Sequence, residues 1–175
     1  MNSSNERKAR EGYADASTAF LLTQVGAAAA MSFGERIAKI GLAPQHAGIL
    51  RILGLSPGLS QRALAKRLRM LPSRLVALVD ELEEKGLVER RRDPGDRRTH
   101  ALHLTEAGAS ATTAIGDVAR EHDGAVCAAL TAEEKTQLTT LLARIAEQQR
   151  LTPGVHPGYK HLDGAKPPCA PSKQA

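Results

Sequence analysis

The sequence predicts a mainly α-helical fold with a small β wing, an α+β class, and three features support it. Apolar residues make up 42% of the 175 residues but aromatic residues only 2%, so the core must be built from Leu, Val, Ile and Ala, which favours packed helices. Apolar residues recur at helical spacing along most of the chain. Residues 87–104 instead favour β-type side chains on either side of a turn.

The helix predicted over 72–85 is the centre of this fold. Pro72 suits a first helical position, and Gly86 stops the helix. The apolar residues of the segment form one buried stripe, Leu75, Leu78, Val79 and Leu82. Opposite the stripe, near the N-terminal end, lie Ser73, Arg74 and Ala77, whereas Glu81, Glu83 and Glu84 lie further along. The N-terminal half of this helix is therefore suited to DNA, and the acidic half is not.

A basic hairpin is predicted directly after this helix. Residues 87–92 and 99–104 form its two strands, joined by the turn sequence 93–96. Five arginines fall within nine residues and are countered there by Asp93 and Asp96 only: Arg90, Arg91, Arg92, Arg97 and Arg98. Such a cluster favours phosphates or a narrow minor groove, although an isolated arginine run is more often a solvated surface.

The helix predicted over 60–69 decides between these interpretations. Ser60 can cap it, and a tight connection at Met70 and Leu71 joins it to the helix over 72–85. Two short helices, the second presenting its N-terminus, followed by a β hairpin, are typical of a winged helix-turn-helix.

Longer helices are expected on both sides of this unit. Residues 17–39, 44–55 and 105–129 read as helices, and a capping box at Thr131 and Glu134 begins a last one. Their apolar faces exceed what a small winged core can cover, so we expect a homodimer. The predicted organisation is a flexible N-terminus (1–16), a DNA-binding lobe (42–108) within one domain (17–150), dimerisation helices (17–41 and 109–150) and a proline-rich tail (151–175), disordered or loosely strapped to the surface.

Composition also excludes several classes of protein. A net charge of +5 and a pI near 9.5 are compatible with a nucleic-acid partner. Two cysteines, no signal segment and no apolar run long enough for a membrane span favour the cytoplasm. There is no glycine-rich phosphate loop, nucleophile elbow or paired carboxylates, so neither an enzyme nor a cofactor is expected. A metal site from His156, His161 and Cys169 is disfavoured because their spacing matches no fixed ligand scaffold.

Several strings of the sequence resemble the MarR family of bacterial winged-helix regulators. The closest is the wing, where DPGDRR at 93–98 precedes LHLT at 102–105 and Gly108. Residues 42–45, 59–61, 64–65 and 82–88 also resemble family positions, so the resemblance covers about residues 17–150.

The resemblance implies a dimeric transcription regulator, most often a repressor, on a pseudo-palindromic site. Recognition helices would enter successive major grooves about 34 Å apart. By position, the resemblance implies that Ser73 and Arg74 face bases or phosphates and that Arg97 or Arg98 reaches the minor groove from the wing tip. The full set of candidate DNA contacts is Ser60, Gln61, Arg62, Ser73, Arg74, Ala77, Arg90, Arg97 and Arg98. Arg74 is the expected base reader, because its guanidinium can bind guanine O6 and N7, and Asp96 is expected to orient a wing arginine.

Three residues depart from the family pattern. Val76 and Ala77 stand where many relatives carry a hydroxyl and an arginine, and Leu71 replaces a polar cap. Base contacts would then be fewer or differently placed. A weakly specific architectural DNA-binding protein therefore remains an alternative.

The resemblance also implies release from DNA by a small aromatic or phenolic ligand in a crevice between the dimer helices and the lobe. His46 could hydrogen-bond such a ligand, although a structural histidine is the more frequent case, and Phe20 and Phe33 are pocket residues or core anchors. A thiol switch is the rival. Cys127 lies on the Val126 side of a dimer helix, where a buried small hydrophobe is favoured, and Cys169 lies in the tail.

Overall fold

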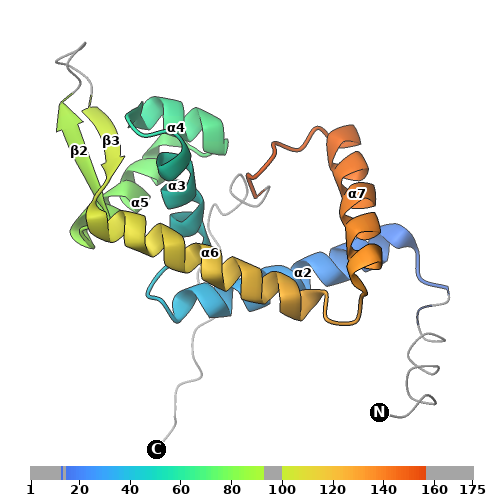
Figure 1. The fold of residues 1–175 in the computed structure, drawn as a ribbon. Coiled ribbons are helices and arrows are strands. Elements are labelled where there is room, and N and C mark those ends of the chain that lie inside the picture. The colour runs from blue at the N-terminus through green and yellow to red at the C-terminus, as the bar shows by residue number, and fades with distance from the viewer. Residues whose placement is uncertain (1–12, 14, 93–99, 157–175) are drawn as a thin grey trace, which may run out of the picture.

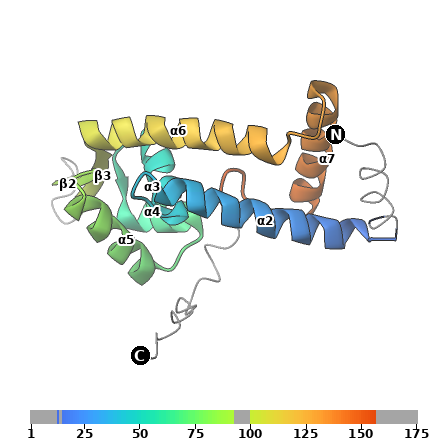
Figure 2. The same ribbon diagram turned by 90° about the horizontal axis from the view of Figure 1, so that it is seen from below.

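The computed structural model describes residue 13, residues 15–92 and residues 100–156. These residues form six helices and a three-stranded sheet: α2 (Thr18–Ala38), α3 (Pro44–Leu55), β1 (Leu59–Ser60), α4 (Gln61–Leu68), α5 (Pro72–Glu84), β2 (Val88–Arg92), β3 (His100–Leu104), α6 (Glu106–Val126) and α7 (Ala132–Gln148). Figure 1 shows a lobe of α3, α4, α5 and the sheet at one end of the molecule. The long helices α2 and α6 run side by side away from it, and α7 stands at their far end (Figure 2).

Side-chain caps explain where several helices begin. Ser17 and Ser60 each accept a backbone N–H three residues on, from Phe20 (3.2 Å) and Ala63 (3.2 Å). The predicted capping box is confirmed, because Thr131 Oγ1 accepts from Glu134 N (3.2 Å) and a Glu134 carboxylate oxygen accepts from Thr131 N (2.9 Å). The predicted helices are thus confirmed with small shifts at their ends, of which the earlier end of α6 at Val126 is one.

The sheet has one strand more than the sequence indicated. Its order is β1-β3-β2, with both pairs antiparallel, and Leu102 of β3 pairs with Leu59 on one side and with Arg90 on the other. The expectation of a two-stranded wing is therefore incomplete. A strand of two residues has no periodicity to recognise, and only its pairing with β3 defines it.

The hydrophobic core lies in the lobe. All of its fully buried members except Ile37 of α2 come from α3, α4, α5 and the sheet, and they include Ile49, Leu50, Leu53, Leu64, Leu68, Leu75, Val79, Leu82, Val88 and Leu102. By contrast, α7 contributes no buried residue and α2 only Ile37. Large apolar side chains on these two helices remain exposed, with Phe20 at 56% and Leu141 at 52% of their surface.

After α7 the chain returns to the lobe through residues 151–156, here called the strap (Figure 1). Arg51 Nη1 donates to the Gly154 carbonyl (3.1 Å), Arg69 Nη1 donates to Thr152 Oγ1 (3.3 Å), and Val155 packs against the core. Of the two forms predicted for the tail, its start therefore takes the second, because residues 152–155 lie against α3 and the end of α4. The rest of that tail, 157–175, lies outside the described residues.

Candidate nucleic-acid interface

The N-terminal half of α5 presents polar and small side chains to solvent. Ser73 and Ala77 are exposed and Arg74 is half-buried, while the predicted apolar stripe is buried as expected. Val76 is also exposed, so this surface is less polar than a typical reading surface. Leu71 provides no side-chain cap at the start of α5, so its side chain accepts none of the first N–H groups of the helix. The arrangement suits a helix end that enters the major groove, with Arg74 as its only cation.

Three further predicted DNA contacts lie at the beginning of α4. Ser60 acts first as the N-cap of this helix, because its hydroxyl oxygen accepts the Ala63 N–H. Gln61 is half-buried and Arg62 is exposed. Of these three, Arg62 has the position and charge best suited to a phosphate.

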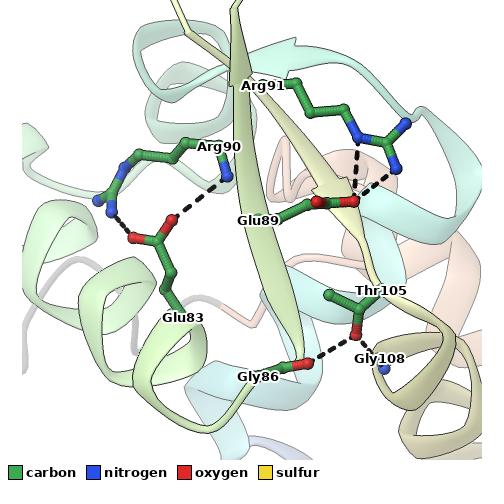
Figure 3. Close-up of polar contacts among 7 residues, drawn as sticks. All are labelled: Glu83, Gly86, Glu89, Arg90, Arg91, Thr105 and Gly108. Atoms are coloured by element: carbon green, nitrogen blue, oxygen red, sulfur yellow. Dashed lines mark hydrogen bonds and ion pairs between the residues drawn. The ribbon is translucent and has the colours of Figure 1, made fainter.

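Arg90, one of the predicted DNA contacts, is bonded to two acids of α5. Its guanidinium is paired with the carboxylates of Glu83 and Asp80, and its backbone N–H donates to Glu83 Oε1 (3.3 Å), as Figure 3 shows for Glu83. Only 22% of the Arg90 side chain is exposed. The two acids lie on the C-terminal half of α5, so Arg90 joins the wing to the recognition helix, and its charge is compensated within the chain. Its contact with DNA stays a prediction.

A second set of bonds holds the root of the wing. Thr105 Oγ1 donates to the Gly86 carbonyl (2.6 Å) and accepts from Gly108 N (3.0 Å), so one hydroxyl joins the end of α5 to the start of α6 (Figure 3). Gly86 adopts a positive φ of 68° just after α5, which glycine tolerates. A Cβ on Gly108 would lie 1.9 Å from the Leu87 carbonyl oxygen, so only glycine fits there. These contacts explain why Thr105 and Gly108 stand three residues apart after the second wing strand.

The wing tip, residues 93–99, lies outside the described residues. The predicted DNA contacts of Arg97 and Arg98 and the orienting role of Asp96 therefore stay predictions. Near the end of β2 that leads to the tip, Arg91 pairs with Glu89 two residues earlier on the same strand.

His46 is used by the fold itself. It is buried, with 4% of its surface exposed; its Nδ1 accepts the Ala43 backbone N–H (3.2 Å) and its Nε2 lies 2.9 Å from Glu81 Oε2. Because Nδ1 accepts, the ring proton must lie on Nε2 and be donated to the carboxylate. Both ring nitrogens therefore have partners within the chain, and the structural alternative describes His46 better than the ligand-binding one.

The two phenylalanines do not form one pocket. Thirteen residues separate Phe20 from Phe33 along α2, which is about 20 Å of helix. Phe33 packs against the core and stacks obliquely on His122 (ring centroids 5.4 Å apart), whereas Phe20 is exposed. Cys127 caps the end of α6 and is half-buried, so it is less enclosed in a single chain than predicted.

The sequence reasoning missed a group of cations behind the recognition helix. From Arg36 to Val79 the chain contains eight Lys or Arg residues and no Asp or Glu, so the rest of the chain carries 16 bases against 19 acids and the net charge of +5 comes from this stretch. Besides the predicted contacts, it includes Arg51, Lys66, Arg67 and Arg69 on α3 and α4. Counting Asp and Glu in a sliding window along the sequence would have revealed this acid-free stretch.

Other kinds of site find no support in the part of the chain that the structure describes. Residues 13, 15–92 and 100–156 contain no cluster of three or more His, Cys, Asp or Glu side chains arranged to hold a metal ion. Within the same ranges, no helix has the length and apolar composition needed to cross a bilayer.

Comparison with known proteins places this architecture in a family. The model of the MarR family matches residues 40–99. A transcriptional regulatory protein for the hcr operon of Thauera aromatica is 38% identical over 113 residues, which is 65% of this chain and 68% of that protein.

Solved structures give the same result. The transcriptional repressor CouR, bound to a 23-mer DNA duplex, is 29% identical with a TM-score of 0.67, over 77% of this chain and 96% of that one. A MarR family protein of Mycobacterium tuberculosis in complex with DNA is 28% identical with a TM-score of 0.65, over 75% of this chain and 98% of that one. It has also been solved with salicylic acid. These relatives are regulators rather than enzymes, and the chain belongs to the MarR family of DNA-binding winged helix-turn-helix transcriptional regulators.

Proposed function

We propose that this regulator represses transcription by binding a pseudo-palindromic operator as a homodimer. The observation that carries the proposal is the pairing of two features in one chain. The recognition helix α5 presents its N-terminal half beside a wing, and the helices α2 and α7 carry exposed apolar faces at the opposite end. Repressor function is supported by the names of relatives, including CouR. A bacterial chromosome as the target implies that the protein acts in the cytoplasm.

The proposed dimer interface is the apolar surface of α2 and α7. A groove of about 460 Å³ between them is lined mainly by apolar side chains: Leu22, Leu138, Leu141, Leu142 and Ile145, with Thr18, Arg144 and Gln148 at its edge. A second copy of the same surface would remove these side chains from water and would place the two recognition helices on two half-sites. Leu141→Arg should therefore give monomers in light scattering, whereas the exposed α6 variant Arg120→Gln should remain dimeric.

The proposed DNA contacts divide by role. Arg74 reads a base, Ser73 and Ala77 approach the major-groove edge, and Gln61 and Arg62 bind phosphates at the start of α4. Arg97 and Arg98 contact the minor groove or its phosphates from the wing tip.

The proposed signal is a small aromatic or phenolic ligand that lowers operator affinity. Support comes from the salicylic acid complex of the Mycobacterium tuberculosis relative. The binding site would not depend on His46, whose ring nitrogens are both bonded within the chain. Salicylate and simple phenols should release the protein from its operator at unchanged ionic strength. If only oxidants do so, the thiol alternative through Cys127 replaces this proposal.

The first experiment is fluorescence anisotropy on the intergenic DNA beside the gene of this protein and on a shuffled duplex, at about physiological salt. Binding at least roughly a thousandfold tighter to the intergenic DNA supports a specific regulator. Equal binding to both duplexes favours the architectural alternative, in which the affinity comes from contacts with the DNA phosphate backbone alone.

A further inference from the structure

We propose that the exposed side of α4, with Lys66 and Arg67 at its centre, is a second phosphate-binding surface for duplex DNA. It extends from Arg62, through Lys66 and Arg67, to Arg69, and we call it the α4 basic surface. The inference rests on the proposed function only in that the partner is duplex DNA. It adds binding residues beyond the recognition helix, the start of α4 and the wing.

Helix geometry places these cations together. Arg62, Lys66 and Arg69 follow the i, i+4, i+7 spacing that gathers side chains on one side of a helix, and all three are exposed. Leu64, Ala65 and Leu68 on the other side are buried in the lobe. The residue expected to bind a phosphate at the start of α4, Arg62, is therefore continuous with Lys66 and Arg69.

Within the described residues, the bonds of this surface are made to neutral groups and not to acids. Arg67 Nη1 donates to Ser56 Oγ (2.7 Å) and Arg69 Nη1 donates to Thr152 Oγ1 (3.3 Å). Behind them, Arg51 Nη1 donates to the Gly154 carbonyl, which is also neutral. The wing differs, because Arg90 and Arg91 are paired there with carboxylates. A guanidinium bonded to a hydroxyl keeps its full charge and spare N–H donors for a phosphate.

The surface is also concave. A hollow of about 460 Å³ is lined by Ala63, Lys66, Arg67, Arg69 and Thr152. The strap forms one wall of it and is held in place by its bonds to Arg51 and Arg69 and by the packing of Val155. The bonds of Arg67 to Ser56 and of Arg69 to Thr152 partly order these two side chains before any ligand arrives, which lowers the entropy cost of binding.

Position along the chain connects this surface to DNA. Arg69 ends α4 in a left-handed conformation (φ 54°), and Pro72 begins the recognition helix three residues later. A duplex that receives the start of α5 in its major groove therefore brings a phosphate strand close to the end of α4. A contact with the DNA phosphates here would position the lobe on the duplex without distinguishing one base sequence from another.

The test compares the double variant Lys66→Gln/Arg67→Gln with the control Lys39→Gln/Lys85→Gln. Both pairs remove two exposed positive charges that have no carboxylate partner among the described residues, and the control residues lie at the C-terminal ends of α2 and α5, outside α4. Gln favours helices, so the fold should persist, and a thermal melt would verify this. A charge-preserving variant, Lys66→Arg/Arg67→Lys, serves as the rescue.

Affinities are measured by anisotropy over a series of salt concentrations on the operator and on a random duplex. We expect the Gln pair to lower affinity for both duplexes by the same factor, roughly tenfold or more at low salt. The slope of log K against log salt should flatten by about 0.9 for each phosphate that the variant no longer neutralises, with the rescue variant near the native slope. A slope and affinity equal to those of the control pair would overturn the proposal, and so would a decrease confined to the operator. If the native protein shows no operator preference at all, the proposed function fails, yet the random-duplex arm still tests the surface.

Discussion

Replacing His46 tests how α3 is attached to the recognition helix. The imidazole is buried and has two partners, the Ala43 N–H at the start of α3 (3.2 Å) and the Glu81 carboxylate on α5 (2.9 Å). His46→Leu keeps roughly the same volume and removes both bonds. His46→Gln should keep the first, because Gln at the third helical position reaches back to the N-cap N–H, and remove the second.

The magnitudes follow from these two bonds. Removing a helix-capping bond costs about 0.5–2 kcal/mol. The bond to Glu81 is worth about 1 kcal/mol or less, because 54% of the Glu81 side chain is exposed and water screens the charge. His46→Leu should therefore lower the free energy of unfolding by about 2 kcal/mol, and His46→Gln by about 1 kcal/mol or less.

Urea denaturation at one fixed protein concentration is the assay, because a dimer becomes more stable as its concentration rises. Glu81→Gln should cost less than either histidine variant, since an amide oxygen can still accept the Nε2 proton. Glu84→Gln on the same helix is the matched control, because Glu84 is also exposed. A His46→Leu protein as stable as the native one, or a His46→Gln protein less stable than His46→Leu, would refute the capping argument.

The remaining predictions concern DNA binding and the strap. Arg74→Ala should lower affinity for the cognate operator by roughly 1–3 kcal/mol while scarcely changing affinity for random duplex. If anisotropy measurements gave equal losses of affinity on both duplexes, Arg74 would not be a base-reading residue. Changing Arg97 and Arg98 together to Ala should weaken binding and flatten its salt dependence, and an unchanged slope would mean that the wing does not contact DNA. Truncation after Arg150 should leave the dimer intact in light scattering, since the apolar faces of α2 and α7 remain. It should destabilise the lobe by about 1 kcal/mol in urea denaturation, because partly buried Val155 is removed, and monomers or unchanged stability would contradict this.

Most of the elements were predictable from local signals. The stripe of Leu75, Leu78, Val79 and Leu82, the capping box at Thr131 and the glycine after α5 each act within a few residues, so the sequence shows them directly. The short strand β1 was missed because its definition depends on β3, more than forty residues later.

The candidate site shows the same difference between what local sequence signals predict and what only tertiary contacts decide. The sequence indicated which residues of α5 face away from the core, because helical periodicity alone decides that. It could not show that Arg90 is neutralised by Glu83 and Asp80, since one arginine in a run looks like any other until a neighbouring helix is placed beside it. The partners of His46 likewise come from Ala43 nearby and from Glu81, 35 residues away.

By itself, the sequence determined the helices, the basic wing strands and the family resemblance, because caps, periodicity and turn residues act over short distances along the chain. Only the tertiary structure decided which charges remain available to DNA. Ion pairing and burial depend on which elements come to lie together, and packing placed Arg90 against acids but Arg67 and Arg69 against neutral hydroxyls.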